Sequence, residues 1–280
     1  MNTSLKVSAD TIGLIIVTFN PNLKVLKNSI EKFSENFKVV ICDNNSENIK
    51  DINDLFRINS NVILLKHNEN CGIAKAQNDA IKFIDKEYPR IDYFCFFDQD
   101  SYLEPSKIFF LCEKLDSLAK KKVAIIGPTQ NVDSNQNIKM HAVRELISSG
   151  SVIQKNIFFD VGFFYEKLFI DFVDYEWCWR ARKKGYKVFI EETTELHHQI
   201  GIDKNKKVIG RNIIPPFRLY YVFRNCICLI REKRILDKER KYWIIFLIKQ
   251  IIFNSFFCPD RLTRINFMLH GIVDTKKCKE

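Results

Sequence analysis

The chain has 280 residues, which is long enough for one large domain or two smaller ones and excludes a mini-protein held together by disulfides. Hydrophobic residues make up 46% of the chain, against only nine glycines and seven prolines, so a disordered, collagen-like or linker-dominated chain is also excluded. The nine cysteines contain no CxxC pair and fit neither a disulfide framework nor a zinc finger. We therefore expect a reducing, cytosolic compartment.

The net charge of +10 is concentrated near the C-terminus, where residues 203–241 hold twelve lysines and arginines against four acidic residues. Residues 242–257 follow as an apolar stretch that Lys249, Gln250 and Asn254 interrupt, and it is too short to cross a bilayer. A basic segment beside an amphipathic one predicts contact with an anionic membrane surface. A solvated basic face and a nucleic-acid partner are the alternatives.

The first part of the chain alternates between short apolar runs and amphipathic segments. Runs that are apolar on both faces are typical of a covered parallel sheet. We expect strands at residues 12–18, 39–42, 62–65, 93–97 and 123–126. Helices are expected at residues 21–33, with Asn20 as N-cap, and at residues 72–88. This order predicts a doubly wound, mostly parallel α/β sheet flanked by helices.

The pattern becomes less regular beyond the fifth strand. Residues 131–139 are expected to form a polar loop, after which a polar turn leads into a strand at residues 152–153. An acidic and aromatic stretch then enters a helix that runs to Lys184 and is stopped by Gly185. A further strand is expected at residues 188–190.

Polar side chains follow four of the expected strands. The four clusters lie at residues 18–20, 43–46, 67–70 and 98–101. Because ligands bind such sheets beyond the carboxyl ends of the strands, the clusters predict a cleft at that edge. The loop after the first strand contains no glycine, which excludes both the dinucleotide fingerprint and the P-loop.

Two carboxylates, Asp98 and Asp100, follow the expected strand at residues 93–97. Their oxygens are the ligands that a hard cation such as Mg²⁺ or Mn²⁺ prefers, and a cation there could neutralise a diphosphate. The structural alternative is an acidic turn in which Ser101 caps the next helix.

Two further carboxylates, Asp174 and Glu176, flank Tyr175 at the start of a predicted helix. A carboxylate that faces the cleft from this position could act as a general base. The structural alternative is that Asp174 caps the helix while Glu176 pairs with Arg180 one turn later.

Eight short motifs occur in a specific order along the chain. They are TFN, DNNS, NxNxGIAxAQN, FFDQDS, SSGS, DYEWCWR, HHQIG and RLYYVFRN. In order and spacing the chain resembles the family 2 inverting glycosyltransferases of GT-A fold over about residues 12–230. Within that family it is most similar to the rhamnosyltransferases of bacterial surface polysaccharides, and FFDQDS is the motif that points most towards rhamnosyl transfer.

The resemblance implies roles for the matching residues. Asp43 would contact the pyrimidine base, Asp98 the ribose and diphosphate, and Asp100 the metal. His198 of HxxG would help to hold the metal or the diphosphate. The other residues implied at the nucleotide-sugar site are Thr18, Asn20, Asn70, Gln77 and Ser149.

The family's catalytic base is the second residue of a Glu-Asp pair, which matches Asp174 here. Val173 stands where that pair has its glutamate. Asp174 and Glu176 are therefore both kept as candidate catalytic residues, and Asp171 stays open as a third carboxylate.

We accordingly expect an enzyme that transfers L-rhamnose from dTDP-rhamnose to a lipid-linked saccharide acceptor, with inversion, in O-antigen or capsule-like polysaccharide synthesis. The cofactor would be Mg²⁺ or Mn²⁺, and the location cytoplasmic and peripheral on the inner face of the cell membrane. Residues 1–202 would form the GT-A domain, with the nucleotide-sugar half at about 1–130 and the acceptor half at 131–202. Residues 203–280 would form a basic, amphipathic helical region associated with the membrane.

Two alternatives remain from the sequence. The same fold could transfer a hexose or an N-acetylhexosamine from a UDP-sugar. A basic nucleic-acid-binding protein would leave the acidic cleft unexplained, so we expect no nucleic-acid partner.

Overall fold

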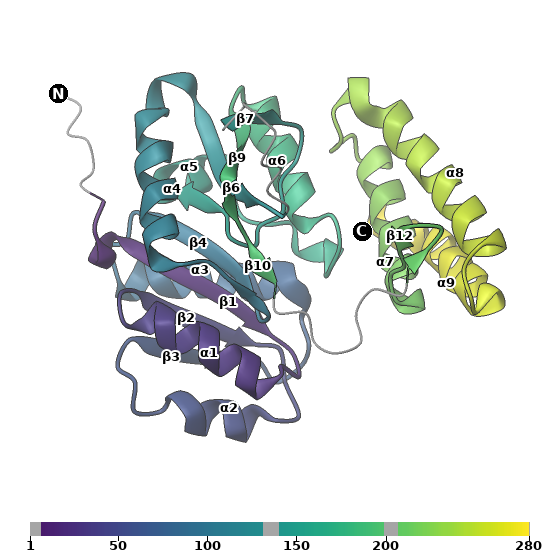
Figure 1. Cartoon of the computed structure of the whole chain (residues 1–280). Helices are drawn as coiled ribbons and strands as arrows, with labels where there is room; N and C mark the ends of the chain where they lie inside the picture. The colour runs from purple at the N-terminus through teal and green to yellow at the C-terminus, as the bar shows by residue number, and fades with distance from the viewer. Residues whose placement is uncertain (1–6, 131–139, 199–206, 280) are drawn as a thin grey trace.

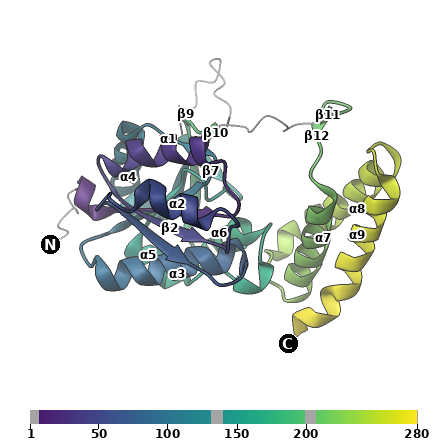
Figure 2. The ribbon, with the colours of Figure 1, turned by 90° about the horizontal axis from the view of Figure 1, so that it is seen from below.

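The computed structural model describes residues 7–130, 140–198 and 207–279, and the predicted loop at 131–139 lies outside them. An eight-stranded sheet with helices on both faces forms the larger part, and three C-terminal helices lie beside it (Figures 1 and 2). The strands of the sheet run in the order β3-β2-β1-β4-β8-β6-β9-β7. This arrangement confirms the predicted doubly wound, mostly parallel sheet.

Each predicted strand is present. The strands of the large sheet are β1 Ile12–Thr18, β2 Lys38–Asp43, β3 Val62–Lys66, β4 Tyr93–Asp98, β6 Val123–Thr129, β7 Met140–Val143, β8 Val152–Gln154 and β9 Lys187–Glu195. Strands β3, β2, β1 and β4 pair in parallel, so their carboxyl ends share one edge. Strand β8 runs antiparallel to both β4 and β6, and β7 antiparallel to β9. Two short pairs are separate: β5 Ser101–Tyr102 with β10 His197–His198, and β11 Lys207–Val208 with β12 Arg211–Asn212.

Helices cover both faces of the sheet, as Figure 2 shows. The helices are α1 Leu23–Ser34, α2 Ile49–Phe56, α3 Gly72–Glu87, α4 Pro105–Ser117, α5 Lys155–Val161, α6 Val173–Lys183, α7 Pro216–Arg231, α8 Arg240–Phe256 and α9 Arg261–Val273. Alternate residues of β1 point to opposite sides: Leu14 and Ile16 pack with α1, α2 and α4, whereas Ile15 packs with α3, α5 and α6. The second of these cores continues into α7 and α8, so one apolar core joins the C-terminal helices to the sheet.

One of the two predicted helix ends is wrong and the other is correct. The side chain of Asn22, not Asn20, caps α1 by accepting from the amides of Lys24 and Val25, so the predicted cap is wrong by two residues. Asn20 instead adopts a left-handed backbone with φ of 47°. Gly185 follows the end of α6 with φ of 86°, which confirms the predicted stop.

Seven of the described cysteines are free thiols, and all of them except Cys71 are buried. Cys228 is disulfide-bonded, which the cysteine pattern did not predict. Over the described ranges, none of the helices combines the length and the apolar character that crossing a bilayer requires.

Helix α5 offers a test of the core on the α3, α5 and α6 side. Phe158 is fully buried and stacks on Trp177, with 5.9 Å between ring centroids, whereas the next residue, Phe159, is 38% exposed. Because truncation of a buried aromatic leaves a cavity, Phe158→Ala should lower the free energy of unfolding by about 3–5 kcal/mol. Phe159→Ala is the matched control and should cost clearly less. Urea denaturation measures both, and equal losses would contradict this placement of the core.

Candidate active site

A cleft of about 850 Å³ opens at the shared carboxyl edge of β1, β2 and β4. Residues at and just after the carboxyl ends of β1 to β4 line it: Phe19, Asn44, Asn70, Asp98, Gln99 and Asp100. Ser148, Ser149 and residues 169–175 also line the cleft. Helices α7 and α8 add Arg218, Val222, Tyr242, Trp243 and Phe246. The predicted cleft is therefore present, and the C-terminal helices form part of its wall.

Asp98 and Asp100 both line this cleft. Asp98 is the last residue of β4, and its backbone N–H donates to the Ser149 hydroxyl at 3.1 Å. Two carboxylates fit a divalent cation that takes its other ligands from a diphosphate and water. Within the described ranges no group of three or more His, Cys, Asp and Glu side chains is arranged to hold a metal. The backbone of His198 is paired with that of Ser101, the residue after Asp100, but the His198 side chain lies outside the described structure.

Thr18, Asp43 and Ser46 form a buried network beneath the cleft. The Asp43 carboxylate accepts from the Thr18 hydroxyl at 2.7 Å and from the Ser46 hydroxyl and amide at 2.6 and 2.8 Å. Asn20 joins the same loops, since its N–H donates to Ser46 and its side-chain oxygen accepts from the Glu47 amide. The side chains of the predicted residues Thr18, Asn20 and Asp43 do not line the cleft, and neither does that of Ser46. They hold the two loops together where β1 and β2 end.

The other predicted nucleotide-sugar residues lie at different depths. Asn70 lines the cleft, and its side chain accepts from the Gly72 amide at 3.0 Å. Ser149 lines it beside Asp98. Gln77 is buried on α3 behind Ser148, at 3.4 Å from its hydroxyl, and the Gln77 side-chain oxygen has no hydrogen-bond partner within the described structure.

Asp174 lies at the N-terminal turn of α6 and lines the cleft. Its two oxygens accept from the Ser148 amide at 3.1 Å and from the Tyr175 amide at 2.9 Å, which fixes the carboxylate. Burial raises the pKa of this carboxyl from 3.8 to about 6, although the two amide hydrogen bonds lower it. The negative charge of Asp98 raises the pKa further. A carboxyl with this pKa is mostly ionised at neutral pH and still accepts a proton readily.

Glu176 is fully buried and does not line the cleft. It forms ion pairs with Arg180 and Arg234, each at 2.9 Å, which confirms the predicted pairing with Arg180. With both arginines beside it, Glu176 is a structural anion that ties α6 to the segment after α7. Among the two carboxylates proposed from the sequence, only Asp174 reaches the cleft.

The third carboxylate, Asp171, lines the cleft but pairs with Arg218 of α7. Sequence reasoning did not single out Arg218 or the α8 aromatics as site residues. The motif RLYYVFRN contains Arg218, but a motif alone does not show that its partner lies 47 residues earlier in the chain.

Comparisons with known proteins identify the family. Residues 14–180 match the model of a family described as glycosyl transferase family 2. This chain belongs to glycosyltransferase family 2.

One curated relative of this glycosyltransferase is a Shigella flexneri protein named dTDP-rhamnosyl transferase RfbF. The two are 34% identical over 296 residues, which covers 94% of each chain. Two solved structures share its fold at 13% identity and a TM-score of 0.54. The match to S. aureus TarS 1–349 covers 95% of this chain and 80% of the TarS chain. The match to GalNAc-T7 with UDP, GalNAc and Mn²⁺ covers 67% of this chain and 43% of the GalNAc-T7 chain. The chain is therefore an enzyme with a GT-A-like fold.

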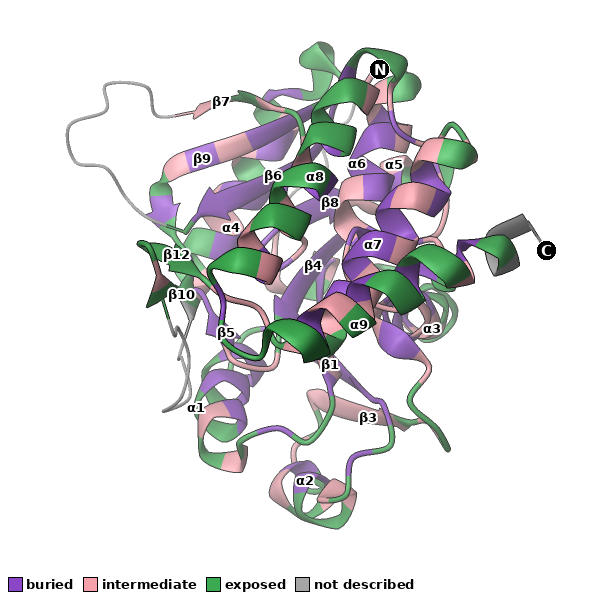
Figure 3. Ribbon diagram, turned by 90° about the vertical axis from the view of Figure 1, so that its right-hand side faces the viewer, coloured by how far each residue is buried: buried purple, intermediate pink, exposed green. Residues whose placement is uncertain are grey.

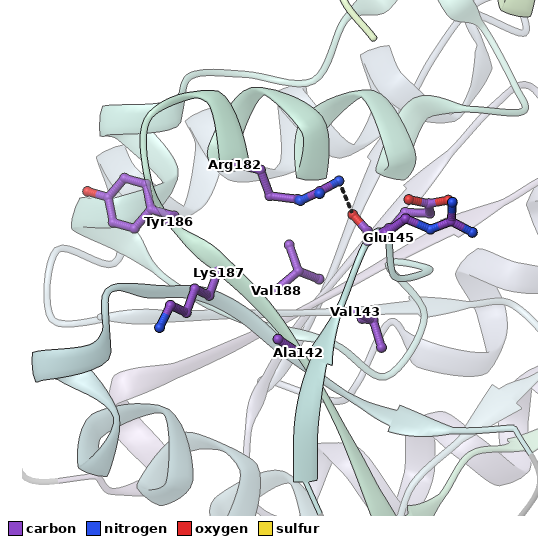
Figure 4. A pocket seen from close by; sticks show the side chains of 8 residues that line it. Ala142, Val143, Glu145, Arg182, Tyr186, Lys187 and Val188 are labelled. Atoms are coloured by element: carbon purple, nitrogen blue, oxygen red, sulfur yellow. Dashed lines mark hydrogen bonds between the residues drawn. The ribbon is translucent and has the colours of Figure 1, made fainter. Parts of the chain in front are cut away.

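A second hollow of the glycosyltransferase, of about 630 Å³, lies between α6 and strands β7 and β9 (Figure 4). Apolar side chains such as Val143 and Val188 line it together with Lys187. Arg182 reaches across it from α6 to the backbone carbonyl of Arg144 at 3.2 Å. Glu145 also lines this hollow, and we assign the hollow no chemistry.

The raised pKa of Asp174 predicts how stability changes with pH. Because the folded state holds this proton more tightly than the unfolded chain, the carboxyl makes the protein less stable as pH rises from about 4 to above 6. Asp174→Asn removes this titration. The melting temperature of the variant, relative to the parent, should therefore rise between pH 4 and pH 7.5. A difference that stays constant over this range would show that Asp174 titrates as in the unfolded chain.

Proposed function

We propose that this glycosyltransferase transfers L-rhamnose from dTDP-rhamnose to a lipid-linked saccharide acceptor, with inversion at the anomeric carbon. The observation that carries the proposal is that Asp98, Asp100 and Asp174 face one cleft. In this proposal Asp98 and Asp100 serve the metal and diphosphate, Asp174 serves as the base, and the sugar lies in the cleft that they share. The name of the Shigella flexneri relative supports the donor, and surface-polysaccharide synthesis is the role that we infer for the product.

In this proposal the nucleotide lies over the loops after β1, β2 and β3. Asn70 and Ser149 would contact the donor directly. Thr18, Asn20 and Asp43 would hold the loops on which the base rests, and Gln77 would support Ser148 from α3. Asp98 and Asp100, with His198, would hold Mg²⁺ or Mn²⁺. When bound, the cation neutralises charge on the departing diphosphate.

Asp174 is the general base of the proposed reaction. Its ionised carboxylate accepts the proton of the acceptor hydroxyl as that oxygen attacks the anomeric carbon. The new glycosidic bond forms as the bond from that carbon to the diphosphate oxygen breaks, and dTDP leaves from the opposite face. The Ser148 and Tyr175 amides hold the carboxylate during this step.

The C-terminal helices support a membrane location. Helix α8 turns Trp243 and Leu247 inward, and its other side is largely exposed (Figure 3). The exposed apolar residues of this side are Ile244, Ile245, Ile248, Ile251, Ile252 and Phe256. Exposed lysines at 241 and 249 lie among them. We propose that residues 203–280 rest on the anionic inner face of the cell membrane, beside the catalytic part at 1–202.

The donor is tested by thermal denaturation and turnover. With Mg²⁺ or Mn²⁺ present, dTDP-rhamnose should raise the melting temperature more than UDP-glucose, UDP-galactose or UDP-N-acetylhexosamines, because only a ligand of the native state stabilises it. With a lipid extract of bacterial membranes as acceptor, Asp174→Asn should bind dTDP-rhamnose like the parent by calorimetry but turn over about a hundredfold or more slowly.

Metal dependence is the control for this experiment. EDTA on the parent and Asp100→Ala should each abolish release of dTDP. If only a UDP-sugar raised the melting temperature, the donor would be a UDP-hexose or UDP-N-acetylhexosamine and not dTDP-rhamnose. Full turnover of Asp174→Asn would remove Asp174 as the base.

Membrane contact is tested by sedimentation with vesicles. The parent should sediment with vesicles rich in phosphatidylglycerol and much less with phosphatidylcholine alone. The double change Ile248→Glu and Ile252→Glu should abolish this binding, because each residue is about half exposed on α8. Ile58→Glu is the control, since Ile58 is 90% exposed outside the C-terminal helices. Equal binding to both vesicles would contradict the preference for an anionic surface, and binding to neither would favour a surface that only water or another protein covers.

A further inference from the structure

The turn before α6, at residues 168–172, has an unusual backbone. Phe169, Asp171 and Phe172 have φ of 66°, 64° and 68°, although none of them is glycine. Each such residue costs about 1–3 kcal/mol and persists only where the surroundings impose the conformation. The turn therefore needs contacts that hold it.

The geometry of this turn determines where Asp174 stands. Phe169, with ψ of −67°, is the centre of a γ-turn in which the Ile170 amide donates to the Leu168 carbonyl at 2.8 Å. Phe172 is the residue at the N-cap of α6, two positions before Asp174. A change of backbone conformation at residues 168–172 would therefore shift or rotate the first turn of α6.

Asn225 of α7 holds the turn through its side-chain amide. It is 1% exposed, and its nitrogen donates to the carbonyls of Leu168, Ile170 and Asp171 at 2.9, 2.7 and 2.9 Å. Its oxygen accepts from Arg224 at 3.0 Å, which fixes the orientation of the amide. The two N–H groups of one side chain thus serve three carbonyls of the strained segment, and the Leu168 carbonyl also accepts from Arg224.

Other contacts close around the same turn. On the side of α3, the Ile73 amide donates to the Phe169 carbonyl at 2.7 Å. A Cβ at Gly72 would lie 2.6 Å from that carbonyl oxygen, so glycine is required for this approach. On the side of α7, the Phe169 ring stacks on Tyr221, with 5.1 Å between centroids, and Arg218 pairs with Asp171.

We propose that Asn225 is a positioning residue, which aims Asp174 into the cleft by holding the turn at residues 168–172 in its left-handed conformation. The proposal rests on the proposed role of Asp174 as base. Asn225 itself does not line the cleft, so it acts through the backbone. A misplacement of about 1 Å of a catalytic group can cost on the order of a hundredfold in rate. Loss of the clamp should thus slow transfer and leave the donor site intact.

The test replaces Asn225 with leucine, which has a similar size and no hydrogen-bond donor. The matched control is Asn254→Leu. Asn254 is 2% exposed on α8, and its hydrogen bonds go to Gln250 and Arg264 within the C-terminal helices. Both changes remove a buried amide from the same helical unit, but only the first touches the turn.

With dTDP-rhamnose as donor, Asn225→Leu should lower kcat about tenfold to a hundredfold and change donor affinity less than about twofold. Asn254→Leu should lower the melting temperature to a similar extent and keep kcat within about twofold of the parent. Equal losses of kcat in the two variants, or a fall in donor affinity that parallels kcat in Asn225→Leu, would overturn the proposal.

Two further comparisons keep the result interpretable. If Asn225→Leu does not fold, Asn225→Ser removes the same amide without adding apolar volume, and failure of both to fold would overturn the positioning role. Asp174→Asn separates this inference from the proposed function. Full turnover of Asp174→Asn would reject both, whereas loss in Asp174→Asn with parent kcat in Asn225→Leu would reject only the positioning role.

Discussion

The left-handed backbone of the turn at residues 168–172 is unfavourable in free energy, and contacts within the turn do not offset this cost. The contacts that offset this cost come from α3 on one side and from α7 on the other, chiefly through Asn225. Helix α7 lies beyond residue 180, where the match to the glycosyltransferase family ends. The C-terminal helices are therefore part of the architecture of the site. Residues 169–173 of this turn and its junction with α6 line the cleft next to Asp174.

The contrast between Asp174 and Glu176 follows from helix geometry. Two residues along an α-helix point about 200° apart, so one of the pair faces the cleft while the other faces the interior. Inside, a carboxylate is tolerated only with compensating charge, which Arg180 and Arg234 supply for Glu176. Asp174 receives amide hydrogen bonds in place of a cation. That difference leaves its pKa raised and its oxygens available to a hydroxyl in the cleft.

Helix α8 has two apolar sides with different surroundings. Trp243 and Phe246 contact the aromatic cluster around Phe172 and line the cleft. The isoleucines of the other side are about half exposed, and much of α8 is coloured as exposed in Figure 3. If a bilayer covers that side, as we propose, a single helix separates the membrane from the cleft. An acceptor carried on a lipid would then have a short path from its anchor to the proposed base.

The sequence by itself determined the sheet and the edge at which the chemistry lies. Apolar runs specify buried strands locally, and the polar residues after them must gather at the shared carboxyl edge, which is why Asp98 and Asp100 could be placed in a cleft. The sequence did not determine which residue caps α1, because Asn20 and Asn22 are chemically equivalent there. Only the tertiary structure decided that Asp174 faces the cleft, that Arg234 neutralises Glu176, and that Asn225 holds the turn. These contacts join residues more than fifty positions apart, and a pattern of local burial carries no information about which distant side chain completes it.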